Sequence, residues 1–436
     1  MPLDPTPSRR TVIKSLAAAG VLGSADAASA DPPGERDEQL RLFSEQAADN
    51  AMEVVTQQNH AYVATGDGMA IVDWRNPSRP ELVADIEASD PDEIGGDDEG
   101  SVGGILDVKV DGDLAAMAHN GGTGITTVDV SDPENPDELA FQNAGHGVHN
   151  AFLKDGYAYL TINESDENVF SEARTDIVDV SDPSDPEKVG EYRLGDDFPE
   201  FAAAGVNPNH DVYVQGDLLY QAYWDAGVVV ADVSDPTDPE LVAQFGDAPG
   251  ADTPQPDPFP VERYYAGEGN AHYVQPSPDG DLTFVGDEKF PGAFQEDPPT
   301  EEFGGVRIFD TSDWNDVEQV GFIAPPDVDV GLRTSHNFDV TANRIHTSWY
   351  NGGVRVHDIT DPTDPELLYS YNPEGYSFWT AVRGRGFTLG GIYGARSDIH
   401  DGGVVFLHAD RGQRRAPSFE GSAPPSGPEI DVDEEE

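Results

Sequence analysis

Four histidines stand at one position of a repeated sequence unit, and their side chains are the ones best suited to chemistry. They are His149, His210, His272 and His336, and the chain has 11 histidines in all. Neutral imidazole is a good ligand for Zn, Mn, Fe, Cu or Ni ions, and three or four converging imidazoles can hold one such ion. We therefore predict a site for one transition metal ion, with three neighbouring histidines plus water as the simplest geometry.

The same four positions have other interpretations. A polar residue there can form hydrogen bonds to the next repeat unit, and a histidine cluster without metal can bind a ligand or transfer protons. The chain contains no Cys, which excludes disulfide bonds, thiolate metal sites and a cysteine nucleophile. A structural role, a metal site and a metal-free ligand or acid–base site remain as three hypotheses.

Loops next to the histidines supply acidic and aromatic residues. Glu288 in "GDEKF" and Asp225 in "YWDAG" are candidates for a general base or an added metal ligand. Candidates for contact with a ligand lie in the corresponding regions of the units: Trp224, Trp349, Tyr350, Trp379, Arg396, His119 and Glu164. Aromatic walls around a polar cluster are typical of a ligand site. The alternative is that these rings close the channel by packing on one another.

A repeated strand–turn–strand pattern must position these residues. Six copies of a "VDVSDP"-like motif occur, in full form as in "TTVDVSDPENPDEL" and in altered form as in "AIVDWRNPSRPELV". The motif aspartates follow one another at intervals of 48 to 78 residues: Asp73, Asp129, Asp179, Asp232, Asp310 and Asp358. Each unit contains a hairpin, a third strand, a proline-containing turn and a fourth strand. Such a unit is typical of a propeller blade, and its acidic turn residues are interpreted as turn formers rather than calcium ligands.

A seventh unit, from Phe378 to Asp410, has the strand pattern and spacing of the repeats but lacks the motif and a fourth strand. The segment from Glu38 to Ala47 has the pattern of an outer strand and precedes the first unit. If this segment completes the last blade, the ring closes and no sheet edge stays open. We predict an all-β propeller of seven four-stranded blades, with six or eight blades as alternatives. Its inner strands would bring the four histidines to one mouth of the central channel.

Several repeats resemble the LVIVD repeat, as in "AYVATGDGMAIVDWRNPSRPELV", "GVVVADVSDPTDPELV" and "GGVRVHDITDPTDPELL". The resemblance covers most of residues 50 to 412. It implies a β-propeller and a surface or exported protein of bacteria or archaea, but no common activity. The histidines depart from the plain repeat, which usually has a charged or small residue followed by Asp at this place.

The chain is strongly acidic, with 84 Asp and Glu against 24 Lys and Arg and a net charge of −60 at pH 7. Nucleic acids and anionic membranes would repel it and are poor partners, so we expect no nucleic acid among its partners. The acidic residues are interleaved with regular apolar alternation, which favours a folded, heavily hydrated surface over disorder. The composition resembles that of haloarchaeal proteins, which work in molar salt, where the Debye length is about 3 Å.

The first 30 residues have the pattern of a twin-arginine signal peptide. Arg9 and Arg10 precede a short apolar run that ends in the small residues Ala28 to Ala30. We divide the chain into this signal at 1–30, a propeller at 36–412 and a disordered acidic tail at 413–436. No later segment is apolar enough to span a membrane. We therefore expect an exported monomer, either extracellular or associated with the cell surface.

Three functions fit these patterns. The first is a module that binds a small molecule, a surface protein or a glycan at the mouth of the channel. The second is a metal-dependent hydrolase, lyase or oxidase, in which the histidine cluster holds a metal that activates water or oxygen. The third is a structural component of the cell surface. The sequence contains no nucleophile elbow, P-loop, dinucleotide fingerprint or helical zinc-protease motif that would decide between them.

Overall fold

The computed structural model describes residues 38–89, 104–166, 169–203, 207–249, 251, 262, 266–267 and 269–409. The predicted signal peptide at 1–30 and the predicted tail at 413–436 lie outside the described residues. The described residues fold into the predicted propeller.

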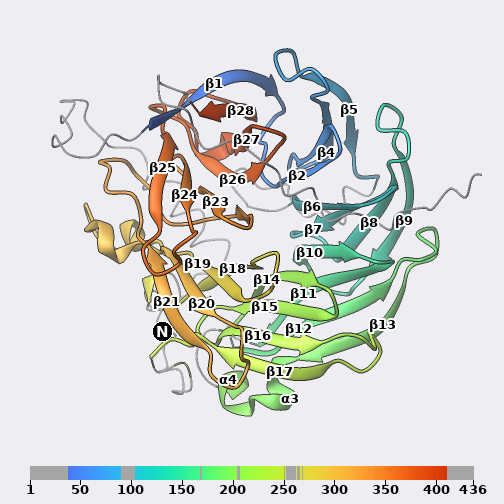
Figure 1. Ribbon diagram of the computed structural model, residues 1–436. Helices are drawn as coiled ribbons and strands as arrows, with labels where there is room; N and C mark the ends of the chain where they lie inside the picture. Colours follow the sequence, from blue (N-terminus) through green and yellow to red (C-terminus); the bar gives the residue numbers. More distant parts are fainter. Residues whose placement is uncertain are drawn as a thin grey trace, which may run out of the picture.

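Seven four-stranded sheets form a ring, which confirms the predicted all-β propeller and its seven blades (Figure 1). Blades one and two consist of β2 (Val54–Gln57), β3 (His60–Ala64), β4 (Gly68–Asp73), β5 (Glu81–Glu87), β6 (Ile105–Asp111), β7 (Leu114–His119), β8 (Gly124–Asp129) and β9 (Asp137–Asn143). Blades three and four consist of β10 (Val148–Lys154), β11 (Tyr157–Asp166), β12 (Val169–Asp179), β13 (Glu187–Arg193), β14 (Asn209–Gln215), β15 (Leu218–Tyr223), β16 (Gly227–Asp232) and β17 (Glu240–Phe245).

Blades five and six continue the ring with β18 (Ala271–Pro276), β19 (Leu282–Asp287), β20 (Val306–Asp310), β21 (Glu318–Ile323), β22 (Phe338–Val340), β23 (Arg344–Ser348), β24 (Val354–Asp358) and β25 (Glu366–Tyr371). Blade seven contains β26 (Phe378–Arg383), β27 (Thr388–Ile392), β28 (Gly403–Ala409) and β1 (Glu38–Ala47). In blades one to six, neighbouring strands are antiparallel and follow one another in chain order. Figure 1 shows β6, β10, β14 and β18 near the centre of the ring and β9, β13, β17 and β21 at its rim.

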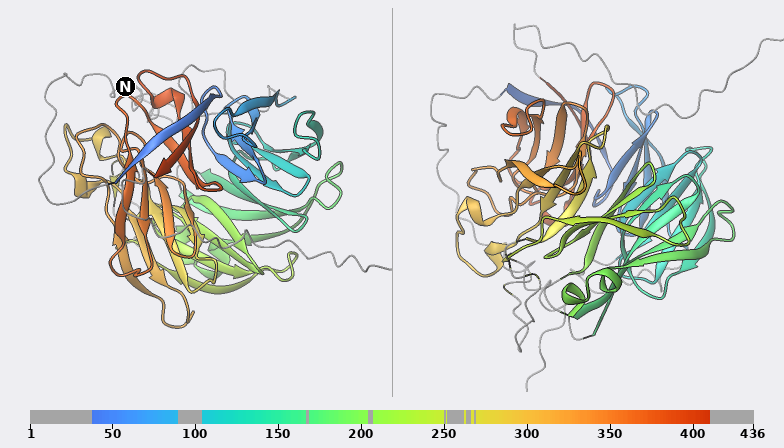
Figure 2. Two further views of the ribbon diagram at one scale, coloured as in Figure 1. Left: turned by 45° about the horizontal axis from the view of Figure 1, so that its top comes forward. Right: turned by 60° about the horizontal axis from the view of Figure 1, so that its bottom comes forward.

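The N-terminal strand β1 closes the ring, as predicted. It lies beside β28 (Figure 2) and runs antiparallel to it. Leu40 is opposite Ala409, and Ala47 is opposite Gly403. Its first residues also pair in parallel with β25, the outer strand of blade six. Blades six and seven are thereby joined into one eight-stranded sheet. The two ends of the propeller sequence thus lie in one blade.

Apolar side chains between neighbouring blades form the core. Ile125 of blade two packs in one cluster with Leu160 and Val178 of blade three, and all three side chains are at most 2% exposed. Strand β16 has five consecutive buried residues because neighbouring blades cover both of its faces. Each blade therefore depends on the next one to bury its apolar surface, at about 25 cal/mol per Å².

The aspartates of the repeated motif form turns. Oδ1 of Asp129 accepts a hydrogen bond of 2.8 Å from the backbone N–H two residues later, and Asp179 and Asp232 do the same at 2.8 Å. This geometry supports their interpretation as turn formers.

The helices of the described residues are short: α3 (Leu194–Asp197), α4 (Pro199–Ala203), η1 (Pro291–Ala293), η2 (Thr300–Glu302) and η3 (Gly394–Arg396). Within the described ranges, none has the length and apolar character that crossing a lipid bilayer requires.

Candidate metal centre

An irregularity at the start of the inner strands places the histidines. The pairing of β14 with β15 skips His210, and the pairing of β18 with β19 skips His272. His149 lies at the corresponding register shift of blade three. In blade six, Ser348 forms backbone hydrogen bonds with both His336 and the residue after it. Such bulges add one residue to a strand and redirect its side chain, so two successive residues can approach the channel where a regular strand would present one.

The four histidines form an arc across neighbouring blades. The ring centroids along the series His149, His210, His272 and His336 are 4.3, 4.0 and 4.4 Å apart. Trp379 extends the arc, with its ring 4.2 Å from that of His336. The structure therefore brings together all four histidines that the sequence pointed to. Those of blades five and six are 2% exposed, and those of blades three and four are half-buried.

Glu288 joins this arc from the loop after β19. Its Oε2 lies 3.5 Å from Nε2 of His272, and its Oε1 lies 3.6 Å from Nε2 of His336. Tyr350 donates a 2.6 Å hydrogen bond to Oε1. His210, His272 and Glu288 each offer one donor atom within 4.8 Å of those of the other two. Two ligands of one ion lie at most roughly 4 Å apart, so small side-chain rotations would bring these atoms onto one ion.

The backbone determines which nitrogen of His336 faces Glu288. Nδ1 lies 2.7 Å from the carbonyl oxygen of Trp379, and because a carbonyl can only accept, Nδ1 carries the proton. Nε2 of the neutral ring is then a lone pair 3.6 Å from a carboxylate oxygen. Two acceptors at this distance call for a proton or a cation between them. His149 is oriented similarly, with Nδ1 2.7 Å from Oδ1 of Asn120.

Burial keeps the cluster close to neutral. Burial, and then the charges of His336 and His149, lower the pKa of His272 well below its ordinary value. Burial also lowers the pKa of His336 well below the ordinary value, against the hydrogen bond to the Trp379 carbonyl. Burial raises the pKa of Glu288 to about 7, against the lowering effects of the hydrogen bond from Tyr350 and of the positive charge of Arg396. Uncharged imidazoles are the form that binds metal ions.

A second tier of polar residues occupies the next positions along the inner strands. Nζ of Lys109 lies 3.2 Å from Oε1 of Glu53 and also pairs with Asp107. Nδ2 of Asn337 donates a 2.6 Å hydrogen bond to the other oxygen of Glu53. Burial alone would lower the pKa of Lys109, but Asp107 and Glu53 raise it above its ordinary value. Burial raises the pKa of Asp211 well above its ordinary value. This tier links blades one, two and six.

Several residues predicted to contact a ligand lie next to the histidine arc. Trp224 stacks on His210 with ring centroids 5.8 Å apart. Tyr350 and Trp379 are buried and contact His336. The guanidinium carbon of Arg396 lies 5.6 Å from the centre of the Tyr350 ring. Their role in binding stays a prediction, but their placement at one mouth agrees with it.

Other predicted residues lie elsewhere. Trp349 is fully buried in the apolar cluster between blades five and six, because the ring turns into the core while the next residue turns to the channel. His119 is fully buried and packs against Phe141 of its own blade, with ring centroids 5.1 Å apart. Asp225 is fully buried beside the stacked Trp224, outside the group of converging donor atoms. Glu164 lies in β11, where its backbone pairs with β12.

Lys109 was not expected at the channel. It is one of only five lysines in the chain, and it stands in the inner strand "ILDVKVD" where alternation directs it to the same side as Asp107. This alternation was the one feature of the sequence that could have placed Lys109 at the channel. Its pairing with Glu53 of another blade depends on the ring geometry, which sequence spacing does not give.

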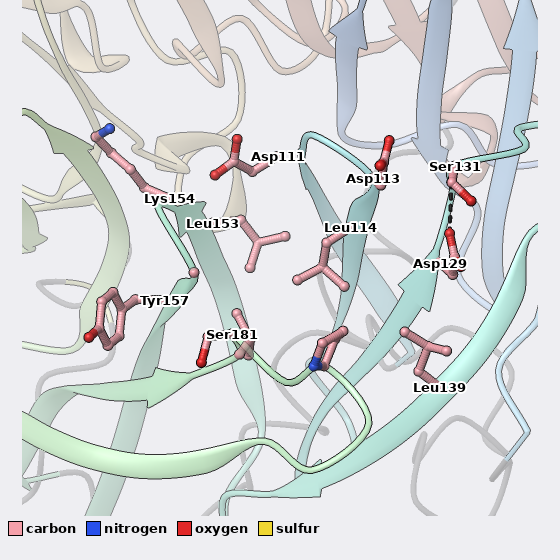
Figure 3. Close-up of a pocket in the computed structure, with 13 residues that line it drawn as sticks. Asp111, Asp113, Leu114, Asp129, Ser131, Leu139, Leu153, Lys154, Tyr157 and Ser181 are labelled. Carbon is pink, nitrogen blue, oxygen red and sulfur yellow. Dashed lines mark hydrogen bonds between the residues drawn. The ribbon is translucent and has the colours of Figure 1, made fainter. Parts of the chain in front are cut away.

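A hollow with a volume of about 440 Å³ lies between blades two and three (Figure 3). Asp111 and Lys154, the last residues of β6 and β10, line it. The histidine arc lies at the starts of the inner strands, so this hollow is at the opposite end of the blades. None of the predicted site residues lines it.

The shape of the chain is shared with solved β-propellers. The β-propeller domain of Myceliophteria thermophila Cps50 (Swd1) is 11% identical with a TM-score of 0.55, and the match covers 84% of this chain and 99% of that one. The WD40 β-propeller domain of Doa1 is 10% identical with a TM-score of 0.54, covering 85% and 98%. The RRP9 WD40 repeats are 9% identical with a TM-score of 0.51, covering 86% and 99%. At such low identity these likenesses show the fold alone.

Sequence comparison identifies the repeats. No curated protein matches the chain. The sequence model of the LVIVD repeat matches residues 48–87, 103–140, 170–193 and 209–247. These stretches fall in blades one to four, where each contributes strands of the ring. The chain is thus a seven-bladed β-propeller, and four of its blades contain stretches that match the LVIVD repeat.

Proposed function

We propose that this protein binds one first-row transition metal ion at the mouth of its channel. His210, His272 and Glu288 form the core of the site, and His336 and His149 flank it. The observation that carries the proposal is the convergence of imidazole nitrogens on both oxygens of one buried carboxylate, at 3.5 and 3.6 Å. Imidazole together with carboxylate suits Zn, Fe, Ni, Cu or Mn.

The structural interpretation of the histidines does not compete with this proposal. His336 uses Nδ1 to bond the backbone of blade seven, and this bond is what presents Nε2 to Glu288. A metal-ligating histidine commonly uses its other nitrogen in this way. Hydrogen bonding between blades therefore supports a metal site by fixing the tautomer and the ring orientation.

The protein would act as a binding module whose ligand includes this ion. The half-buried side chains of His149 and His210 leave one side of the arc open to solvent, in contrast to His272 and His336, which are 2% exposed. A metal ion reached from this side has room for water or a small molecule. This opening favours the second candidate, a metal-dependent enzyme, over a purely structural surface component.

Metal content tests the proposal. The protein is purified without a histidine tag or chelating resin, and bound metals are measured by elemental analysis. We expect one equivalent of a transition metal in the native protein, and loss of most of it in His210→Ala and His336→Ala. His60→Ala, which removes a half-buried histidine from blade one, is the matched control and should keep the metal. A folded native protein that takes up no metal from excess Zn²⁺, Co²⁺ or Cu²⁺ would contradict the proposal.

We further propose that the protein works outside the cytoplasm, after export by the twin-arginine route. The support is the pair Arg9 and Arg10 ahead of a short apolar run. Replacing both arginines by lysine should keep the protein inside the cells, as fractionation would show. Unchanged export of that variant would contradict the route.

A further inference from the structure

We propose that the metal site takes a small carboxylate anion, with Arg396 as the residue that recognises its charge. This inference rests on the proposed function and names the class of molecule that would reach the open side of the ion. It is carried by the position of Arg396, by its partners and by the charge of the chain around it.

The backbone holds Arg396 at the mouth. It ends the short helix η3, which follows β27 of blade seven. The backbone N–H of Ala395 donates a 3.0 Å hydrogen bond to Oδ1 of Asn50 in blade one. Nδ2 of Asn351 in blade six donates a 3.4 Å hydrogen bond to the carbonyl of Arg396. Three blades therefore fix this residue, so its placement does not depend on the long side chain alone.

The guanidinium lies against aromatic rings. Its central carbon is 5.6 Å from the centre of the Tyr350 ring and 5.9 Å from that of Phe290. Tyr350 donates its hydroxyl hydrogen bond to Glu288. One tyrosine thus contacts both the guanidinium and the proposed metal ligand. A guanidinium that lies along ring faces keeps N–H donors at its edge for another partner.

The chain is strongly acidic, with 84 acidic residues against 24 basic ones, and several of its arginines pair with carboxylates. Arg307, for example, lies 2.7 Å from Oδ1 of Asp287, and Arg174 lies 2.8 Å from Oδ1 of Asp176. Among the described residues, no carboxylate lies within salt-bridge distance of Arg396. Its charge lowers the pKa of Glu288 without an ion pair, so the half-buried guanidinium is suited to an anion that arrives from solution.

A carboxylate is the anion that fits best. A planar guanidinium binds the two oxygens of a carboxylate side by side, and a metal ion on the other side of the molecule would stabilise the same negative charge. Trp379 and Tyr393 pack on each other with ring centroids 4.8 Å apart, and both side chains are buried, so they support the mouth from beneath. A small anion would therefore meet a cation and a metal together.

Titration of Co²⁺-loaded protein with acetate tests this inference. The visible absorption of bound Co²⁺ reports a change in its ligands, and the measurements are made at fixed KCl concentration. We expect a saturable spectral change in the native protein, with an acetate affinity at least tenfold weaker in Arg396→Gln and partly retained in Arg396→Lys. Arg75→Gln, which removes an arginine whose side chain is 61% exposed, is the matched control and should behave as the native protein. Equal acetate affinity in Arg396→Gln and the native protein would overturn the inference.

Two measurements separate this inference from the proposed function. The Co²⁺ content of Arg396→Gln is measured first and should equal that of the native protein, because Arg396 is not a metal ligand. If the native protein binds no metal, acetate is titrated against the metal-free protein by tryptophan fluorescence. Acetate binding that Arg396→Gln weakens would then support the anion site alone, and no difference between the two proteins would refute it.

Discussion

At the scale of single residues, each imidazole of the arc has two nitrogens with different surroundings. His336 shows this division most clearly, since Nδ1 is bonded to a backbone carbonyl at 2.7 Å and Nε2 faces Glu288 at 3.6 Å. The hydrogen bond from Nδ1 stabilises the fold, because it joins blades six and seven. The lone pair on Nε2 is available to bind a metal ion. The same side chain can therefore hold the ring of blades together and offer a ligand to an ion.

Replacing Glu288 by Gln should weaken metal binding while leaving the fold intact. Gln has nearly the same size and can still accept the hydrogen bond from Tyr350, but it removes the negative charge that attracts a cation. We expect an affinity lower by on the order of 100-fold, measured by competition with a chromophoric chelator. Glu301→Gln, at an exposed glutamate in η2, should change nothing. Equal affinities in all three proteins would remove Glu288 from the ligand set.

Buried histidines outside the arc should make the protein sensitive to acid. Burial lowers the pKa of His346 to about 3, with a smaller lowering effect from Arg344, and its Nδ1 lies 2.9 Å from Oγ1 of Thr388. Below the ordinary pKa of about 6.5 the unfolded chain binds a proton that the folded chain does not. Its contribution to stability is therefore lost as pH falls from about 6.5 towards 3, by up to about 1.4 kcal/mol per pH unit.

His346→Gln tests this acid sensitivity by comparison with the native protein. Urea unfolding at pH 7 and pH 5 gives the loss of unfolding free energy for each protein. The native protein should lose more than the variant, because the variant lacks one group that titrates only when unfolded. Comparing losses removes the effect of the other carboxylates and histidines. Equal losses would mean that His346 is protonated in the folded protein.

The four histidines could be found from sequence because they share one repeat position, but their partners could not. Glu288 comes from a loop, and its approach to His272 and His336 depends on the relative orientation of blades five and six. Trp349 and Tyr350 are neighbours in sequence, yet the first is in the core and the second reaches Glu288. The turn that separates them, with a positive φ of 47° at Tyr350, leaves no clear mark in the residue pattern.

At the scale of elements, β1 matters more than its place outside the repeats suggests. The alternation in "EQLRLFSEQA" predicted an outer strand that closes blade seven, and its pairing with β28 confirms this. Its parallel contact with β25 was not predicted, because strand direction relative to a neighbouring blade follows from the twist of the sheets. The register bulges at the inner strands were also missed. A bulge adds one residue without changing the polar and apolar composition of the strand.

Truncating Leu40 should test the closure of the ring by β1. Leu40 is 5% exposed and packs with Val354 and Phe378 in the cluster that joins blades six and seven. Leu40→Ala should lower the free energy of unfolding by about 2–5 kcal/mol. Leu42 in the same strand is 44% exposed, so Leu42→Ala should change stability by no more than about 0.5 kcal/mol. Chemical unfolding of both variants gives the comparison. Similar losses in the two would show that β1 is not held by its buried face.

At the scale of the whole molecule, a ring of blades and a negative surface place opposite demands on stability. The ring requires each blade to lie close to the next, while a net charge of −60 at pH 7 makes the compact state repel itself. The Debye length falls from about 10 Å at 0.1 M salt to about 3 Å at 1 M. Salt should therefore relieve the repulsion between charges on neighbouring blades, which are farther apart than paired side chains.

Stability should rise steeply with KCl up to about 1 M and then level off. Urea is the denaturant for this measurement, because guanidinium chloride would itself screen the charges. The free energy of unfolding is followed from 0.1 to 3 M KCl at pH 7. Screening is nearly complete once the Debye length is shorter than the spacing between surface charges, so further salt should add little. An increase that continues undiminished to 3 M would instead indicate ion binding or exclusion of salt from the surface, and a flat response would show that the carboxylates scarcely repel one another in the folded ring.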